Sequence, residues 1–238
     1  MVRADLHMSI EIFPVHGIHE VATGDDLGTV ILGGLEASDI VLVDRDIVVV
    51  THKIVSKAEG RVEAAPDDDA YRQLAEREAR AILRRRGDLI IAQTEHGFIC
   101  ANAGVDRSNV PDGQAVLLPV DSDRSAHHIR VNLERATGAA IAVIVTDTFG
   151  RPWRRGLVDV AIGVSGLPAI VDLRGRPDAH NRTMHVTEIA VVDEIAAAAD
   201  LVMGKSEAIP VAVIRGLNLE GDGRATDLVR PPEEDMFR

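Results

Sequence analysis

The sequence contains a single cysteine, Cys100, and aromatic residues make up only 3% of its 238 residues. One cysteine cannot form a disulfide within the chain, and such sparing use of cysteine indicates a reducing compartment such as the cytosol. Cys100 lies in the apolar stretch GFICANAG, which favours a buried, inert thiol over a nucleophile. With so few aromatic residues the core must consist of Val, Ile, Leu and Ala, as is typical of an enzyme-sized α/β or α+β domain.

Long apolar runs and an excess of positive charge are also missing. No run approaches the roughly 20 residues that span a bilayer, and the N-terminus lacks the pattern of a secretory signal. The net charge of −12 argues against binding to DNA or RNA, because phosphate backbones require clustered positive charge. The sequence therefore predicts a cytoplasmic protein without a membrane or nucleic-acid partner. A small anionic substrate would need a local basic patch or a metal ion.

The common nucleotide-binding loops and zinc-ligand spacings are absent as well. No G-x-G-x-x-G follows a predicted strand, which leaves a Rossmann-type site without support. The turn at 204–206, Gly-Lys-Ser, is not a Walker loop; it either contacts a phosphate or caps a helix. His127 and His128 fall in a predicted helix and His180 and His185 near a loop, without a zinc-ligand pattern.

Hydrophobic periodicity predicts a mixed α+β fold. Strands are predicted at 8–14, 47–55, 88–93, 97–101, 115–119, 139–146, 157–164, 168–173 and 210–215, and helices at 70–86, 122–137 and 187–203. These elements do not alternate regularly enough for a doubly wound parallel sheet. Glycine and proline fall in loops and no long linker interrupts the chain, so we expect mixed sheets with a few helices in one domain spanning 1–238, arranged in two lobes.

Two pairs of polar residues follow predicted strands. Asp106 and Asn109 stand in the loop after the strand at 97–101, and Asp147 and Thr148 follow the apolar run AAIAVIVT. Carboxylate, amide and hydroxyl oxygens suit a hard divalent cation such as Mg²⁺ or Mn²⁺, which keeps waters for substrate phosphates. Each pair taken alone favours a turn-forming Asx motif. Only their convergence in space would make a metal site.

A basic segment, THKIVSKAEGRV at 51–62, leaves a strongly β-branched strand. If that strand continued, Lys53 and Lys57 would lie on one face and could clamp a triphosphate. A solvated strand end is the alternative, which the sequence alone slightly favours.

The segment VTDTFGRPWRRG at 145–156 carries the only tryptophan, Trp153, among three arginines. Tryptophan usually seeks burial and arginines seek water or anions, and such local inconsistency is typical of functional sites. We expect Gly150 and Pro152 to turn the chain sharply here. Trp153 either stacks on an aromatic ring or packs the loop into the core or a dimer interface.

Five segments resemble a known family when taken together. They are GIHEVATGDDL (17–27), THKIVSKAEGR (51–61), GVDRSNV (104–110), VTDTFGRPWRRGLVDVAIGVSG (145–166) and VMGKSEAIPVAVIRG (202–216). In this order they resemble the coenzyme F420-0:L-glutamate ligase family, the γ-glutamyl ligases of deazaflavin cofactor biosynthesis. The likeness covers nearly the whole chain, and the blocks S-K-A-E-G-R and D-T-F-G-R-P-W-R-x-G are long and unusual.

The resemblance implies a GTP-dependent ligase that adds L-glutamate to the lactyl-phosphate end of coenzyme F420-0 and then adds γ-linked glutamate. It implies a fold particular to the family, a homodimer, two divalent cations (Mg²⁺ or Mn²⁺) and a potassium requirement. The γ-phosphoryl group of GTP would pass to the substrate carboxylate, and the amine of glutamate would attack the acyl phosphate. Such chemistry needs positioning and charge neutralisation more than a covalent side chain, so we expect no catalytic nucleophile.

The resemblance also assigns roles by position. The residues implied to bind GTP are Gly17, Ile18, His19, Glu20, His52, Lys53, Lys57 and Asn109, together with the turn Met203, Gly204, Lys205, Ser206, Glu207, Ala208, Ile209 and Pro210. The implied metal ligands are Asp106, Asp147 and Thr148. The residues implied to contact the phosphodiester or carboxylates of the acceptor are Arg151, Trp153, Arg154 and Arg155.

The last block departs from the family at Lys205. Members often have a glutamine there that ligates a metal, and an ammonium group cannot replace that oxygen. Glu207 is a possible substitute ligand. This departure weakens the expectation of a second metal.

Three alternatives stay open. The chain ends at RPPEEDMFR, without the flavin-binding reductase-like domain that some relatives carry, so it is either a free-standing ligase or one domain of a bifunctional enzyme. It could also be a non-catalytic protein that binds a nucleotide or deazaflavin. A purely structural subunit is disfavoured because the five segments occur together and in order.

Overall fold

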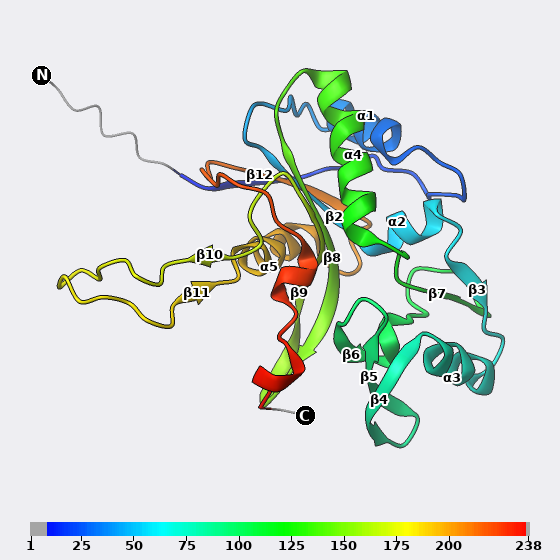
Figure 1. The fold of residues 1–238 in the computed structure, drawn as a ribbon. Coiled ribbons are helices and arrows are strands. Elements are labelled where there is room, and N and C mark those ends of the chain that lie inside the picture. The colour runs from blue at the N-terminus through cyan, green and yellow to red at the C-terminus, as the bar shows by residue number, and fades with distance from the viewer. Residues whose placement is uncertain (1–8, 237–238) are drawn as a thin grey trace, which may run out of the picture.

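The computed structural model describes residues 9–236 and is built around a five-stranded mixed sheet (Figure 1). The strands, in their order across the sheet, are β1 (Glu11–Pro14), β12 (Val211–Arg215), β2 (Ile47–Thr51), β8 (Ala142–Arg151) and β9 (Arg154–Ser165). Only β2 and β8 run parallel; the other neighbours are antiparallel. The mixed sheets and separate helices confirm the predicted α+β class.

The centre of this sheet is a continuous run of β-branched residues. Val48, Val49 and Val50 of β2 are fully buried, as are Val143 and Ile144 of β8. A strand that is apolar on both faces must be covered on both faces. Helix α4 (Ser122–Thr137) and helix α5 (Val191–Met203) both pack on β9 and lie on opposite sides of the central strands in Figure 1.

Acidic caps fix the starts of three helices. Asp121 accepts a hydrogen bond from the backbone N–H of Arg124 at the start of α4, and Gly138 ends that helix with φ of 77°. Asp26 caps α1 (Leu27–Ala37), which packs on α4, and Asp67 caps α3 (Asp68–Arg77).

A second buried cluster lies apart from the main core. It joins α3 to the small sheets and is centred on Ile90 and Leu117. Those sheets are β3 (Val62–Ala64) with β7 (Gln114–Val116), and β4 (Ala79–Arg86) with β5 (Leu89–Thr94) and β6 (Ile99–Ala101). The two-lobed arrangement and the extent of the domain stay predictions.

The remaining elements are short. They are α2 (His52–Ala58), the projecting ribbon of β10 (Val171–Asp172) and β11 (Glu188–Ile189), and the 3₁₀ turns η1 (Asn102–Gly104), η2 (Ala225–Leu228) and η3 (Pro232–Glu234) (Figure 1). No helix within the described part of the chain has the length and apolar character to cross a bilayer.

The helix predicted at 70–86 is wrong in its second half. Helix α3 ends at Arg77, and the following residues form β4, which pairs with β5 through a tight turn at Gly87 and Asp88. The segment ARAILRRR contains good helix formers, but pairing with the apolar β5 overrides that weak local preference. Gly87 adopts a φ of 59°, which suits the two-residue turn between β4 and β5.

The strand predicted at 47–55 is also too long, because β2 ends at Thr51 and α2 starts at His52. Lys53 and Lys57 still share a face, but through the i, i+4 spacing of a helix and not the alternation of a strand. The alanine-rich helix begins at Val191, later than predicted, and α1 was not predicted at all. The strand predicted at 168–173 shrinks to β10, and part of the strand predicted at 8–14 lies outside the described residues.

The arginine-rich segment after Asp147 is a β-hairpin and not an irregular loop. Strand β8 continues to Arg151, β9 begins at Arg154, and these two residues pair. The chain reverses at Pro152 and Trp153, as expected for Pro152, whereas Gly150 lies within β8 and takes no part in the turn. Trp153 has a φ of 56° and is 81% exposed. Its packing into the core is therefore excluded.

We expect Gly163→Ala to destabilise the protein by about 2–3 kcal/mol, the usual effect of overpacking a close contact. A Cβ at Gly163 of β9 would lie 2.3 Å from the backbone oxygen of Ser122, so α4 would have to move. Gly33→Ala in α1 is the matched control, because a Cβ there meets nothing within 4 Å. Alanine favours the helix, so that variant should gain about 0.5–1 kcal/mol. Denaturant unfolding gives the free energy of unfolding of each variant. Equal values for the two variants would contradict the close contact between β9 and α4 at Gly163.

We expect the thiol of Cys100 to be unreactive in the native protein at pH 8. Burial, with a smaller effect of the Asp147 carboxylate, raises the pKa of this thiol to about 12, and the side chain is covered. Since only the thiolate reacts, modification by an aromatic disulfide reagent should be at least about 100-fold slower than after denaturation in guanidinium. Rapid stoichiometric labelling of the folded protein would show instead that Cys100 is accessible.

Candidate functional site

A cavity of about 300 Å³ opens where β2, β8 and β9 meet the start of α2 and the end of α5. Its lining residues are Ile18, His19, Glu20, Val21, Thr51, Lys53, Ile54, Lys57, Asn109, Thr148, Asp159, Asp200, Met203, Gly204, Lys205, Ser206, Ala208, Ile209 and Pro210. These come from segments far apart in the sequence, and the fold brings them around one space.

Lysine is rare in this protein and is concentrated at this cavity. The chain has only three lysines, Lys53, Lys57 and Lys205, and all three line it. In a chain with a net charge of −12, this is the local basic patch that an anionic ligand requires.

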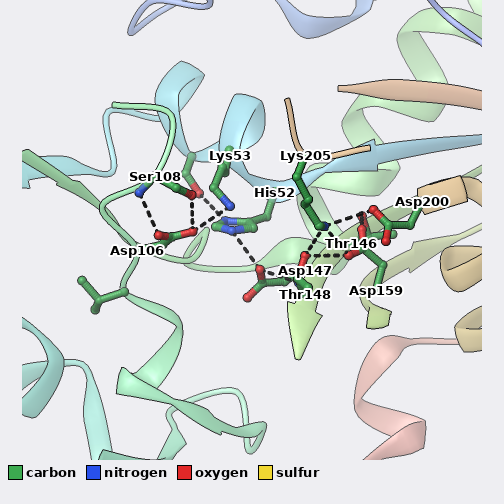
Figure 2. A network of polar contacts seen from close by, with 12 residues as sticks. His52, Lys53, Asp106, Ser108, Thr146, Asp147, Thr148, Asp159, Asp200 and Lys205 are labelled. Carbon is green, nitrogen blue, oxygen red and sulfur yellow. Dashed lines mark hydrogen bonds and ion pairs between the residues drawn. The ribbon is translucent and has the colours of Figure 1, made fainter. Parts of the chain in front are cut away.

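Acidic side chains hold the three lysines in place. The Lys57 ammonium pairs with Glu20, the Lys53 Nζ lies 2.9 Å from Asp106 Oδ2, and Lys205 lies between Asp159 and Asp200 (Figure 2). Because each ammonium already has a carboxylate partner, the basic patch is largely neutralised within the protein. A polyphosphate would need an additional cation here.

The Asp147 carboxylate stands at the centre of the network in Figure 2. The buried His52 Nε2 lies 3.2 Å from its Oδ1, and the same oxygen accepts a hydrogen bond from the backbone N–H of Thr148. Burial by itself raises the pKa of this carboxyl, but the opposing effects of His52, Lys53 and the Thr148 N–H hold the pKa below its usual range. Asp147 is therefore ionised at neutral pH.

Asp106 carries a negative charge for similar reasons. Burial raises the pKa of the Asp106 carboxyl, and Lys53 together with hydrogen bonds from Ser108 more than compensates, so that the pKa is lowered. Lys53 acts electrostatically on both Asp106 and Asp147. Lys53 therefore pairs directly with Asp106 and also favours the charged form of Asp147.

Lys205 makes the densest polar contacts in the cavity. Its Nζ donates to Thr148 Oγ1 at 2.6 Å and lies 3.0 Å from both Asp159 Oδ1 and Asp200 Oδ1 (Figure 2). Thr148 Oγ1 in turn donates to Asp159, which Thr146 also contacts. Burial lowers the pKa of Lys205 on its own, but the bonds to Asp159 and Asp200 prevail and raise it.

Left-handed backbone conformations occur in the walls of the cavity. Asn109, Gly204 and Ala208 have φ values of 57°, 61° and 54°. For alanine this conformation is strained, and strained residues cluster at binding and catalytic sites. The turn from Met203 to Pro210 is therefore held by its surroundings in a shape that its own residues do not prefer.

Most of the residues predicted to bind the nucleotide lie together here. Gly17, His52 and Glu207 are the exceptions: they do not line the cavity, although His52 lies beneath it against Asp147. Glu207 instead accepts a hydrogen bond from its neighbour Ser206.

The predicted metal ligands are only partly brought together. Lys53 pairs with Asp106 and acts electrostatically on Asp147, whereas the Thr148 hydroxyl faces Lys205 and Asp159. Among residues 9–236, no group of three or more His, Cys, Asp or Glu side chains is arranged to hold a metal ion. The carboxylate oxygens of Asp106 and Asp147 suit a hard cation. The hydroxyl of Thr148, in contrast, already donates a hydrogen bond to Asp159 and accepts one from Lys205.

The residues predicted to contact the acceptor lie outside the cavity. Arg151, Trp153, Arg154 and Arg155 form the exposed tip of the β8–β9 hairpin, and the Arg151 guanidinium donates to the backbone oxygen of Arg155. Arg151, the first residue of the tip, is three positions beyond Thr148 along β8, a distance of roughly 10 Å. Their role toward a substrate stays a prediction.

Sequence reasoning missed Asp159 and Asp200. Asp159 is 4% exposed. In the sequence it stands within the apolar segment LVDVAIG, and a charged residue within an otherwise apolar strand could have marked it as a candidate site residue. Asp200 is the acidic residue that follows four alanines in α5, five positions before Lys205. Nothing in the sequence pairs these residues with Lys205, because they come from different elements.

A second hollow, of about 420 Å³, lies between α1, α2 and α4. Its charged lining includes Asp25, Asp26 and Glu59 with a single arginine, Arg135, and no lysine. This acidic surface is less suited to an anionic ligand than the lysine-lined cavity, which we take as the candidate site.

Comparison with known proteins shows which family the chain belongs to. A relative from Methanothermobacter thermautotrophicus named coenzyme F420:L-glutamate ligase is 44% identical over 97% of this chain and 100% of its own length. Proteins of the same name from Methanopyrus kandleri and Archaeoglobus fulgidus are 39% and 38% identical over 97% of the chain, covering 98% and 97% of their own lengths. Residues 17–216 match the F420-0:Gamma-glutamyl ligase family, a range that includes every residue lining the cavity. The chain belongs to the F420-0:gamma-glutamyl ligase family.

Proposed function

We propose that the protein is a GTP-dependent ligase that joins L-glutamate to coenzyme F420-0 through an amide bond, and then adds γ-linked glutamate. The observation that carries this proposal is the gathering of all three lysines of an acidic chain around one cavity, in a member of this ligase family. The names of its relatives support the acceptor and the amino acid.

The lysine-lined cavity is the proposed GTP site. Lys53 and Lys57 lie one turn apart on α2, with both side chains largely buried, and offer ammonium groups for the phosphates. Asn109 and the turn at 203–210 form the other walls. We assign phosphate recognition to the lysines and enclosure of the nucleotide to that turn.

Asp106 and Asp147 would hold a divalent cation, Mg²⁺ or Mn²⁺, once the Lys53 ammonium, which lies 2.9 Å from Asp106 Oδ2, turns from that carboxylate to the phosphates. Both are ionised, as their lowered pKa values indicate, and both polar contacts of Asp147 with the described residues fall on Oδ1, leaving Oδ2 available. When bound, the cation would neutralise and orient the phosphates. His52 fixes the orientation of Asp147 from the buried side.

The proposed reaction has two steps. An oxygen of the acceptor's terminal carboxylate attacks the γ-phosphorus of GTP, the bond to the β-phosphate oxygen breaks, and GDP leaves. The amine of glutamate then attacks the carbon of the acyl phosphate, loses a proton and displaces inorganic phosphate. The lysines position the phosphates and offset their charge, which is the main demand of phosphoryl transfer.

Other features carried by the family resemblance are part of the same proposal. They are a potassium requirement, a homodimer, and contact between the acceptor and the arginines at the β8–β9 tip. Exposed Arg151, Arg154 and Arg155 fit an anionic acceptor chemically.

Incubation of the protein with coenzyme F420-0, glutamate, GTP, Mn²⁺ and K⁺ should lengthen the acceptor by glutamyl units, as mass spectrometry would detect. Omitting GTP or Mn²⁺ should stop the gain. GTP binding by calorimetry without any gain in mass would contradict the ligase and favour a non-catalytic nucleotide-binding protein.

We expect Asp147→Asn to lower the ligation rate by at least about 100-fold with little loss of fold, because the amide is nearly isosteric but lacks the charge that a cation requires. Its GTP-dependent rate and its circular dichroism are compared with those of Asp88→Asn. Asp88 is an exposed residue of the β4–β5 turn that pairs with Arg72, and neither residue lines the cavity. That control should behave as the native protein. Normal turnover of Asp147→Asn would exclude the cation-binding role.

A further inference from the structure

We propose that the Lys205 ammonium serves as a built-in cation of this site, so that the nucleotide binds together with one divalent cation and not two. The inference rests on the proposed function, since it concerns the cations that accompany the nucleotide. It concerns a position distinct from Asp106 and Asp147, on the opposite side of the Thr148 backbone (Figure 2).

The geometry around Lys205 is that of a cation held by oxygen ligands. Oxygens of Thr148, Asp159 and Asp200 lie 2.6–3.0 Å from its Nζ. They come from β8, β9 and α5, and the ammonium joins these elements at one point. The ammonium donates hydrogen bonds to Thr148 and Asp159 and forms an ion pair with Asp200.

The charge balance explains why a cation must be present here. Asp159 is almost fully buried and Asp200 is three-quarters covered. Two carboxylates that share one small space repel each other unless a positive charge lies between them. Lys205 supplies that charge from within the chain, so the cluster forms without a dissolved ion.

The same contacts exclude a divalent ion from this position. The hydroxyl of Thr148 already donates to Asp159 and accepts from Lys205. A metal ion bound by these oxygens would have to lie within a few ångströms of the ammonium, where repulsion between like charges is strong. The residues at this position therefore do not fit a second divalent cation while Lys205 is present.

The local backbone aims Lys205 into the cluster. Gly204 ends α5 with a φ of 61°, a conformation that residues with a side chain rarely adopt, and a Cβ there would lie 3.0 Å from Glu207 Cγ. The turn brings the next side chain, Lys205, back toward Asp200 in the last turn of α5. The placement of the ammonium is thus built into the end of the helix.

The number of divalent cations per nucleotide tests the proposal. The protein is dialysed to equilibrium against Mn²⁺ and saturating GDP. The concentrations of Mn²⁺ and GDP are then measured in the compartments with and without protein, and the differences give the number of Mn²⁺ ions per bound GDP. We expect one Mn²⁺ per bound GDP for the native protein. We expect two for Lys205→Gln, because removal of the ammonium frees two carboxylates and a hydroxyl, and the glutamine adds an oxygen ligand.

Lys57→Gln is the matched control. It removes a positive charge from the same cavity, but among residues 9–236 Lys57 forms an ion pair only with Glu20 and holds no group of carboxylates. Its ratio should stay at one Mn²⁺ per GDP even if its affinity for GDP falls. A rise to two in this variant would mean that any loss of charge admits another ion, which contradicts a specific role for Lys205.

The outcomes separate the two proposals. Two Mn²⁺ per GDP in the native protein, or a ratio that stays at one in Lys205→Gln with GDP bound, would overturn the built-in cation and leave the nucleotide site intact. Failure of the native protein to bind GDP would overturn the proposed function and this inference with it. Bound GDP in each variant also shows that the site has folded.

Discussion

The parallel pairing of β2 with β8 is the constraint on which the site depends. In this pair Thr51, the last residue of β2, lies opposite Thr146 in the middle of β8, and the two strands run in the same direction. The residues that follow are His52 and Asp147, which meet at 3.2 Å. A shift of register by one residue would turn these side chains to the wrong face and separate them. The buried valines of β2 hold that register because they are covered on both faces.

From this edge the structure places opposite charges in pairs. The first turns of α2 carry Lys53 and Lys57 to the cavity, and β9 returns Asp159 beside Thr148. Buried charges are tolerated only when they are paired, and each lysine here has a carboxylate partner. The cavity is thus stable without a ligand, yet its lysines can be shared with phosphates because two of their partners, Glu20 and Asp106, remain partly exposed.

The sequence was sufficient to predict the α+β class and to single out most of the segments that line the cavity. Helix α4 was predictable to the residue because Asp121 and Gly138 are strong local end signals. The β4 strand was not, since ARAILRRR forms a helix as readily as a strand until β5 is available as a partner. The same limit applies to β2, whose apolar run continues without a break into the first turns of α2.

At the candidate site, too, some features can be recognised from neighbouring residues in the sequence and others arise only when distant segments pack together. Lys53, Asp106 and Asp147 stand in recognisable motifs, but their pairing is a property of the folded chain. Asp159 and Asp200 have no motif of their own, and only the packing of α5 on β9 brings them to Lys205. A family resemblance assigns a role only to a residue that matches the family. Lys205 differs from the residue that family members often have, so its role must be inferred from the side chains that surround it.

A cation attached to the chain differs from a bound ion in ways that affect the site. The ammonium loses less freedom on joining the cluster than a free ion would, and it cannot be removed by chelation. It carries one positive charge against the two of Mg²⁺ or Mn²⁺, so it balances Asp159 and Asp200 only in part. Lys205 can organise the root of the β8–β9 hairpin before a nucleotide arrives, but less charge remains for the phosphates. In the proposed arrangement a divalent cation at Asp106 and Asp147, together with Lys53 and Lys57, would provide most of the charge that a triphosphate requires.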